Sequence, residues 1–251
     1  MSGPMLATLP REVIWHDVEC GGYAADLALY GRLASQAKRA PILDLGAGCG
    51  RVALALARAG HPVTAVEQAP ELVAELERRA QAERLAITCE LGDVRELDLL
   101  PARFGLILAP MQLVQLLGGP AGRLALLRRA RAHLAPGGRA AVSIVEGRLS
   151  SGDAASPLAD VREEGGAVFS SLPISVAATA GEIVVRRERR IAWPGGEQSV
   201  QAHEQRLDVL DAATLSEEAR QAGLATVGIE RLAGGERHVD STVILLEAAD
   251  V

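Results

Sequence analysis

The amino-acid sequence predicts an α/β fold, with a doubly wound, mainly parallel sheet and an added antiparallel β segment. Five short apolar runs alternate with helix-like segments up to residue 146, a pattern typical of a parallel sheet. The first run ends in three alternating glycines, Gly46, Gly48 and Gly50, directly before an Ala/Leu-rich segment. Beyond residue 147, two long runs of strand-forming residues flank the turn-forming sequence Pro-Gly-Gly-Glu.

Local signals define the elements of the alternating part. Apolar residues at helical spacing predict a helix over 23–38, and we expect residues 1–20 to be a partly ordered lead-in. Gly60 ends the helix that begins at Arg51, because glycine readily adopts the left-handed conformation of a helix C-terminus. The expected strands cover 42–45, 62–66, 85–91, 104–109 and 139–145, and the expected helices cover 51–59, 70–84, 112–117 and 120–134.

The rest of the chain predicts a β-rich insertion and a return to the sheet. A loop over 147–160 and weak strands over 161–178 precede a hairpin of strands 182–193 and 199–209. If Pro194 faces Glu197, Arg187 lies opposite Glu204 and Glu188 lies opposite His203. A helix over 210–222 and strands over 224–232 and 242–248 follow. We therefore divide the chain into an N-terminal helix with the α/β core (1–146), a β-rich insertion or lid (147–209), and a final helix with two strands that complete the sheet (210–251).

Composition argues against several classes of protein. With 26 basic residues, 32 acidic residues and only two each of Phe, Tyr and Trp, the chain is poorly equipped to follow a nucleic-acid backbone. Its three scattered cysteines suit a reducing cytoplasm, and the abundance of Ala, Arg, Leu and Gly is typical of a high-GC bacterial genome. We expect no membrane association, because there is no signal-peptide pattern and no apolar run of about 20 residues. The five histidines lack metal-ligand spacing, so we expect no metal.

Polar or glycine features follow four of the predicted strands. Ligands of an open parallel sheet bind at the carboxyl ends of its strands, which is where these residues lie. Asp44 precedes the glycine turn, and its negative charge disfavours a phosphate and favours a cationic ligand. Glu67 ends the second strand, Asp93 follows the third, and Ala109-Pro110 ends the fourth. The spacing G-x-G-x-G also differs from the dinucleotide fingerprint, whose third glycine comes one position later.

Four segments together resemble the class I S-adenosylmethionine-dependent methyltransferases, of the small-molecule type. They are ILDLGAGCGR at 42–51, VTAVE at 63–67, GDV at 92–94 and LLRRARAHLAPGGR at 126–139. The resemblance covers residues 23–146 well and the final helix and strands more loosely. It implies a seven-stranded Rossmann-like sheet, with S-adenosylmethionine as the cofactor. The strand-four end, Ala109-Pro110-Met111-Gln112, departs from the Asn-Pro-Pro-Tyr of enzymes that methylate amides or bases.

The resemblance implies a role for each matching residue. The three glycines bring bare backbone to the methionine part of the cofactor, Asp44 receives its ammonium, and Glu67 accepts hydrogen bonds from both ribose hydroxyls. Asp93 and Val94 meet the adenine, and Ala109 lies near the reacting sulfur. The implied cofactor-binding set is Asp44, Gly46, Ala47, Gly48, Gly50, Glu67, Gln68, Asp93, Val94 and Ala109.

The acceptor side is less defined by the sequence. Tyr23 and Tyr30 are seven residues apart, so a helix over 23–38 would place both on one face, either toward the acceptor or packed on the domain. The other candidates for catalysis are Gln112 and His203, and Gln115 is a further substrate-side candidate. Arg32 is either a partner of the cofactor carboxylate or a solvated helix residue. We expect methyl transfer to oxygen or nitrogen of a small molecule by in-line displacement. The alternatives are a non-catalytic cofactor-binding protein and a nucleotide-linked oxidoreductase, and a homodimer is also possible through the hairpin edge.

Overall fold

The computed structural model of the chain describes residues 9–38, 40–146, 158–179, 181–234 and 239–249. The predicted loop over 147–160 therefore lies mostly outside the described residues. Among the described residues, no helix combines the length and the apolar character needed to cross a membrane. The helices are α1 (Arg11–Cys20), α2 (Leu27–Gln36), α3 (Arg51–Arg58), α4 (Pro70–Glu83), the 3₁₀ helix η1 (Leu113–Leu116), α5 (Pro120–His133) and α6 (Ala212–Gln221).

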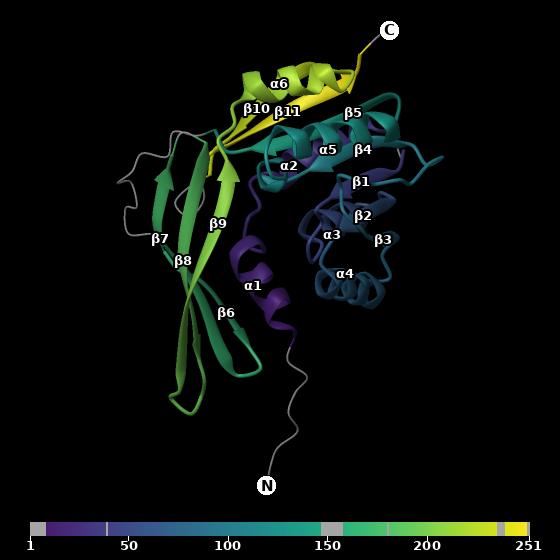
Figure 1. The fold of residues 1–251 in the computed structure, drawn as a ribbon. Coiled ribbons are helices and arrows are strands. Elements are labelled where there is room, and N and C mark those ends of the chain that lie inside the picture. The colour runs from purple at the N-terminus through teal and green to yellow at the C-terminus, as the bar shows by residue number, and fades with distance from the viewer. Residues whose placement is uncertain (1–8, 39, 147–157, 180, 235–238, 250–251) are drawn as a thin grey trace.

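The main sheet has seven strands in the order β10-β11-β5-β4-β1-β2-β3 (Figure 1). The strands are β1 (Ile42–Leu45), β2 (Val63–Glu67), β3 (Ile87–Leu91), β4 (Phe104–Ala109), β5 (Leu134–Ile144), β10 (Leu224–Leu232) and β11 (Ser241–Ala248). Strands β1 to β5 pair in parallel, and β11 runs antiparallel between β5 and β10. This confirms the predicted fold class and places the switch in strand order at β1, where ligands bind in such sheets.

Helices cover both faces of this sheet. One apolar cluster joins α5, α6 and one set of strand side chains, such as Leu43 and Ile107. The other joins α2, α3, α4 and the alternate strand side chains, such as Ile42 and Leu106. All four residues of β1 are buried, as expected of a central parallel strand that is covered on both faces.

A second, antiparallel sheet has the order β6-β7-β8-β9, and it corrects the predicted hairpin register. Its strands are β6 (Asp160–Glu164), β7 (Ala167–Ala178), β8 (Glu182–Ala192) and β9 (Gln198–Asp208). Arg187 lies opposite His203 and Arg186 opposite Glu204, so the pairing of Glu188 with His203 is wrong by one residue. The reason is the turn: Trp193 pairs with Glu197 across three residues rather than two, and Gly196 has a φ of 87°.

Helix α1 is the largest departure from the sequence prediction, which expected no helix in the lead-in. It lies between the second sheet and α4 (Figure 1), and Trp15 packs edge-on against Phe169 with ring centroids 5.4 Å apart. Asp17 pairs with Arg79 of α4 at 2.5 Å and with Arg162 of β6 at 2.7 Å. The apolar residues Ile14, Trp15 and Val18 pack on the second sheet, whereas α4 is joined to α1 by an ion pair, so contacts with residues distant in sequence hold this helix.

Candidate functional site

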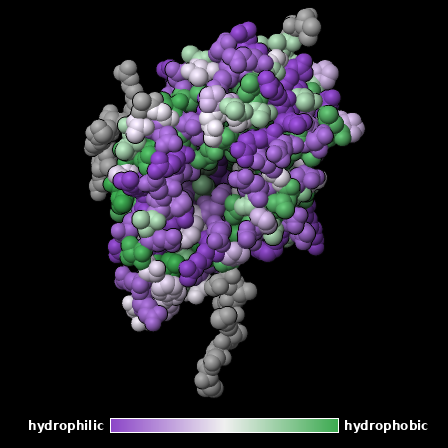
Figure 2. All heavy atoms as spheres, in the orientation of Figure 1, coloured by the Kyte–Doolittle hydropathy of each residue, from purple (hydrophilic) through white to green (hydrophobic). Residues whose placement is uncertain are grey.

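Two small cavities lie at the carboxyl ends of the parallel strands and share Gly46. We call them the inner cavity, of about 40 Å³, and the outer cavity, of about 120 Å³. The inner cavity is lined by His16, Cys20, Asp44, Gly46, Ala47, Arg51, Val52, Pro110 and Met111. The outer cavity is lined by Gly46, Glu67, Gln68, Gly92, Asp93, Val94, Arg95, Leu113, Leu116 and Leu117. Figure 2 shows that the molecular surface is hollowed between the second sheet and the main sheet.

The glycine turn has no room for side chains. Gly46, Gly48 and Gly50 have φ values of +64°, +54° and +90°, which side-chain-bearing residues rarely adopt. A Cβ on Gly48 would lie 2.0 Å from Nε2 of His16, and a Cβ on Gly50 would lie 2.2 Å from Cδ1 of Leu76. Of the three glycines, only Gly46 lines the two cavities, whereas Gly48 and Gly50 pack against His16 and Leu76.

Asp44 is a buried carboxylate without a hydrogen-bond partner. Asp44 is 1% exposed, and among the described residues no donor reaches either carboxylate oxygen in good hydrogen-bond geometry. Burial raises the pKa of Asp44 to about 7, although the nearby charge of Arg51 and the nearby backbone N–H of Ala53 act in the opposite direction. An unsatisfied, buried carboxylate is costly to the fold, and a cationic ligand would remove this cost.

Arg51 supplies the opposite charge in the inner cavity. Its guanidinium donates to both oxygens of Asp26, at 2.6 and 2.7 Å, and to the carbonyl of Tyr23 at 3.0 Å. Asp26 is 1% exposed, so this pair is largely excluded from water. The inner cavity thus places a fixed guanidinium beside the unsatisfied carboxylate of Asp44.

Glu67 joins β2 to the glycine turn at the outer cavity. Its two oxygens accept hydrogen bonds from the backbone N–H groups of Gly48, Gln68 and Ala69, at 3.0, 2.8 and 3.0 Å. These contacts hold the carboxylate at the start of α4 and at the edge of the cavity. A carboxylate has about four lone-pair sites, so with three of them occupied about one remains for a ligand hydroxyl.

The far end of the outer cavity is polar on one side and apolar on the other. Asp93 accepts from the backbone N–H of Arg95 at 2.8 Å and from its guanidinium, and this hydrogen bonding lowers the pKa of Asp93. Leu113, Leu116 and Leu117 supply the apolar side. This combination suits a flat ring that carries an amino group at its edge.

The turn after β4 has a strained backbone. Met111 and Gln112 have φ values of +46° and +25°, which are uncommon for residues with side chains. Pro110 and Met111 line the inner cavity, whereas Ala109 packs in the core and lines neither cavity. Ala109 thus lies outside both cavities, because its side chain packs in the apolar cluster under α5 and α6, and the next two residues line the inner cavity instead.

The residues predicted for the acceptor side make contacts within the protein and lie outside the two cavities. Tyr23 precedes α2, so it does not share a helix face with Tyr30; its hydroxyl lies 3.2 Å from Oγ of Ser241. Tyr30 is fully buried in the core, and burial raises the pKa of its hydroxyl. His203 lies on β9, where burial and the charge of Arg189 lower its pKa, and it lines neither cavity.

The glutamines and Arg32 are also outside the two cavities. Gln115 is 1% exposed, and its amide bonds to the backbone of Val145 and of Asp208, which ties η1 to the ends of β5 and β9. Gln112 precedes η1 and lines neither cavity. Arg32 forms an exposed ion pair with Glu230 at 3.4 Å.

Sequence reasoning did not assign His16, Cys20, Arg51 or Met111 to the site, although all four line the inner cavity. A signal was present for Arg51, which directly follows the last glycine of the turn at the first position of α3. Met111 directly follows Ala109-Pro110, the predicted end of the fourth strand. Nothing in the local sequence connects α1, and hence His16 and Cys20, to the glycine turn.

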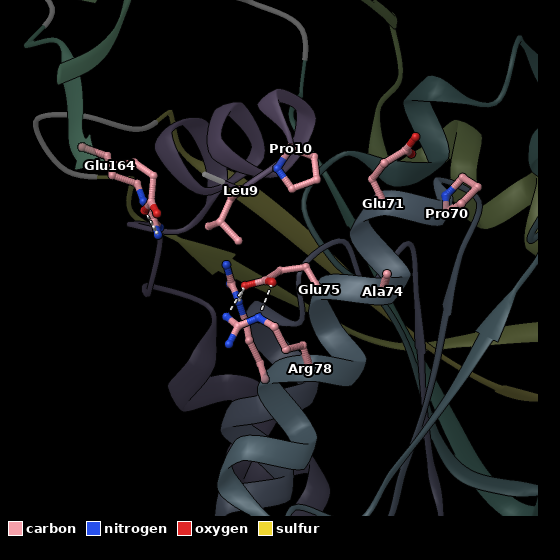
Figure 3. Close-up of a pocket in the computed structure, with 10 residues that line it drawn as sticks. Leu9, Pro10, Pro70, Glu71, Ala74, Glu75, Arg78 and Glu164 are labelled. Carbon is pink, nitrogen blue, oxygen red and sulfur yellow. Dashed lines mark hydrogen bonds and ion pairs between the residues drawn. The ribbon is translucent and has the colours of Figure 1, made fainter. Parts of the chain in front are cut away.

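A cavity of about 940 Å³ is separate from this site. It lies between the start of α1, α4 and β6, and its lining shares no residue with the inner or outer cavity (Figure 3). Its charges pair within the protein: Glu75 bonds Arg78 and Arg79, and Arg162 bonds Glu164. We assign it no ligand.

One cluster, His16, Asp17 and Cys49, offers three ligand atoms within 4.8 Å of one another. Its chemistry does not favour a metal. Asp17 is already paired with two guanidinium groups, and burial raises the pKa of the Cys49 thiol to about 12. The thiol therefore stays protonated near neutral pH, whereas a metal needs the thiolate.

The chain matches one family model and is similar to several solved structures. Residues 42–138 match the family model described as a methyltransferase domain. The CcbJ methyltransferase from Streptomyces caelestis is 25% identical over 92% of each chain, with a TM-score of 0.71. The sugar N-methyltransferase KedS8 from a Streptoalloteichus species is 18% identical over 100% of this chain and 96% of that one, with a TM-score of 0.76.

A third similar structure is CalS10 from Micromonospora echinaspora, described as an amino pentose methyltransferase with S-adenosylmethionine bound. It is 18% identical over 94% of this chain and 98% of that one, with a TM-score of 0.70. No curated protein matches the chain. The structural likenesses extend over nearly the whole chain, including the second sheet.

Proposed function

We propose that the chain is a class I S-adenosylmethionine-dependent methyltransferase that methylates a nitrogen of a small molecule, with oxygen as the second candidate; the methyltransferase-domain match over residues 42–138 and the likeness to CcbJ support the family. S-adenosylmethionine is the cofactor and small molecules are the substrates. Family membership argues against the nucleotide-linked oxidoreductase that the sequence left open. Nitrogen is favoured because KedS8 and CalS10 are described as methyltransferases of a sugar nitrogen and of an amino pentose.

The observation that carries the proposal is the pair of opposite charges in the inner cavity. Asp44 lacks a partner for both oxygens, and Arg51 lies in the same cavity. The amino-acid end of the cofactor is a zwitterion, with an ammonium that matches Asp44 and a carboxylate that matches Arg51. Arg51 is held by Asp26 in a bidentate pair, so its position is fixed before the ligand binds.

The outer cavity matches the adenosine. Glu67 is held beside Gly48, where its remaining lone pair suits a ribose hydroxyl. Asp93 and the backbone of Val94 suit the amino and ring nitrogens of adenine, and the leucines of η1 suit the ring face. Gly46 lines both cavities, so it lies where the two halves of the cofactor would meet.

When bound, the cofactor supplies a methyl group on a positively charged sulfur. The protein then has to hold the acceptor atom in line with that methyl group and to exclude water. Pro110 and Met111 lie on the wall of the inner cavity and are placed for this positioning role. We propose that the second sheet covers the acceptor site, and that residues 1–146, 147–209 and 210–251 act as core, cover and sheet completion.

Titration calorimetry with S-adenosylhomocysteine tests the cofactor site, and product formation with a panel of amino sugars and their hydroxyl analogues tests the acceptor. We expect micromolar binding and methylation of amines rather than of hydroxyls. Binding without turnover on either panel would favour the non-catalytic alternative. Absence of binding would refute the assignment of both cavities.

Two further points belong to this proposal. Cys20, Cys49 and Cys89 are all free thiols, which fits a cytoplasmic protein. Edge strand β9 is available to pair with a second copy, and light scattering would detect such a homodimer.

A further inference from the structure

We propose that His16 is the proton-accepting residue of the acceptor site, which takes the proton of an amine substrate at Nε2. The inference rests on the proposed function. Helix α1 brings His16 into the same cavity of about 40 Å³ as Asp44, Arg51 and Met111. Because all of these side chains line one small cavity, the imidazole lies close to the charged side chains and to the turn after β4.

The ring is fixed against the glycine turn. Its Nε2 edge lies on Gly48, where a Cβ would come within 2.0 Å of Nε2. Nδ1 is enclosed and has no hydrogen-bond partner. No described residue bonds Nε2, which leaves this nitrogen available to a ligand at the turn.

Ion pairs hold α1, and with it the imidazole, in place. Asp17, the next residue, pairs with Arg79 and Arg162, and Glu19 pairs with Arg189 at 2.7 Å. These pairs join α1 to α4 on one side and to the second sheet on the other. A general base needs such a fixed position relative to the proton that it takes.

His16 is also the suitable base by its charge state. Burial lowers its pKa, Asp17 and Glu67 raise it, and Arg79 and Arg51 lower it, so the ring is neutral near pH 7. The other groups of the inner cavity are less suited. Burial raises the pKa of Cys20 to about 11, and Asp44 faces the ammonium of the cofactor in the proposed arrangement.

The proton passes from the substrate amine to Nε2 of His16 and then to water. An amine acceptor arrives as an ammonium, and Nε2 takes one proton, which leaves an imidazolium and a free electron pair on nitrogen. That pair forms the new nitrogen–carbon bond, and the pair of the broken carbon–sulfur bond stays on sulfur. The imidazolium then gives its proton to water, which restores the neutral ring.

Sinefungin allows a test without knowledge of the acceptor, because it carries an amine where the transferred methyl group lies. We would measure the affinities of sinefungin and S-adenosylhomocysteine for the wild type and for His16→Phe, which keeps a flat ring without nitrogen. We expect the preference for sinefungin to fall about tenfold or more in His16→Phe, the effect of losing one hydrogen bond to a charged group. An unchanged preference, with both ligands bound, would overturn the role of His16 and leave the proposed function intact.

His61→Phe is the matched control. His61 also has an enclosed Nδ1 without a partner, but it precedes β2 at the amino end of the sheet, away from both cavities. We expect its ligand preference to equal that of the wild type, and a similar fall in both variants would overturn the proposal. If neither ligand binds the wild type, the proposed function fails together with this inference.

A second measurement on the wild-type protein covers the case in which His16→Phe does not fold. Nitrogen NMR of the imidazole rings reports protonation, and the His16 signal is the one absent from His16→Gln. We expect a neutral ring at pH 7 that shifts with sinefungin and not with S-adenosylhomocysteine. A charged ring at pH 7, or no response to sinefungin, would overturn the proposal.

Discussion

The two walls of the inner cavity are built in different ways. One wall comes from one short stretch of the chain, residues 44–52, and consists of Asp44, Gly46, Ala47, Arg51 and Val52. The other wall is α1, whose residues His16 and Cys20 are joined to the first only through contacts that are distant in sequence. Site residues that are close together in the sequence form a recognisable motif. Site residues that are brought together by contacts between distant segments can be identified only in the folded structure.

Gly48→Ala tests whether the two walls touch, and we expect the largest effect here. The added Cβ needs a φ of +54° and meets the ring of His16, so the free energy of unfolding should fall by about 3 kcal/mol in urea denaturation. Gly60→Ala is the control, because Gly60 has a similar φ of +87° with open space around it. Equal losses in both variants would mean that α1 does not pack on the turn.

Asp17→Asn tests how α1 is held. The change leaves Arg79 and Arg162 without their shared carboxylate, and we expect a loss of about 2 kcal/mol, below that of a fully buried pair because both arginines are partly exposed. Glu247→Gln, in the more exposed pair with Arg139, serves as the control and should change little. If the two variants lose the same stability in thermal denaturation, the clamp on α1 is not a significant contact.

Asp44→Asn tests the local wall and separates binding from stability. We expect the affinity for S-adenosylhomocysteine to fall about tenfold, ~1.4 kcal/mol, because the ammonium loses its charged partner. The stability of the free protein should stay the same or rise, since a buried carboxyl without partners is removed. Calorimetry and urea denaturation of one preparation measure both, and parallel losses would contradict the assignment.

The pKa of Asp44 predicts how the stability of the free protein and its affinity for the cofactor depend on pH. Burial raises the pKa of Asp44 from 3.8 to about 7, so the folded state holds a proton that the unfolded state has lost between those values. Asp44 therefore stabilises the free protein least at high pH: its contribution declines as pH rises from about 4 to about 7. Cofactor affinity should rise through about pH 7, and this rise should be smaller in Asp44→Asn.

Arg32→Ala should have the smallest effect. Its pair with Glu230 is long, at 3.4 Å, and solvent-exposed, so we expect a change of less than about 0.5 kcal/mol in stability and none in cofactor affinity. Calorimetry with S-adenosylhomocysteine checks the second point. A loss of affinity would restore Arg32 as a cofactor ligand and would displace Arg51 from that role.

The sequence located the parallel strands closely because each is a short apolar run with its own start and stop signals. The sequence prediction was less accurate for the register of the hairpin and for the start of α2. The hairpin register shifted by one residue because Gly196 permits a three-residue turn. The helix that we expected from Tyr23 begins at Leu27, which separates Tyr23 from Tyr30 and removes the argument for a shared face.

By itself, the sequence determined the fold class, the order of the elements and four residues that line the two cavities, Asp44, Gly46, Glu67 and Asp93, because strand ends and glycine turns are local and parallel strands bring their carboxyl ends to one edge. The tertiary structure alone decided that α1 forms, that His16 lies on Gly48, and that Asp44 is left without a partner. The physical reason is that burial, ion pairing and close packing depend on residues distant in the chain, which no short pattern encodes.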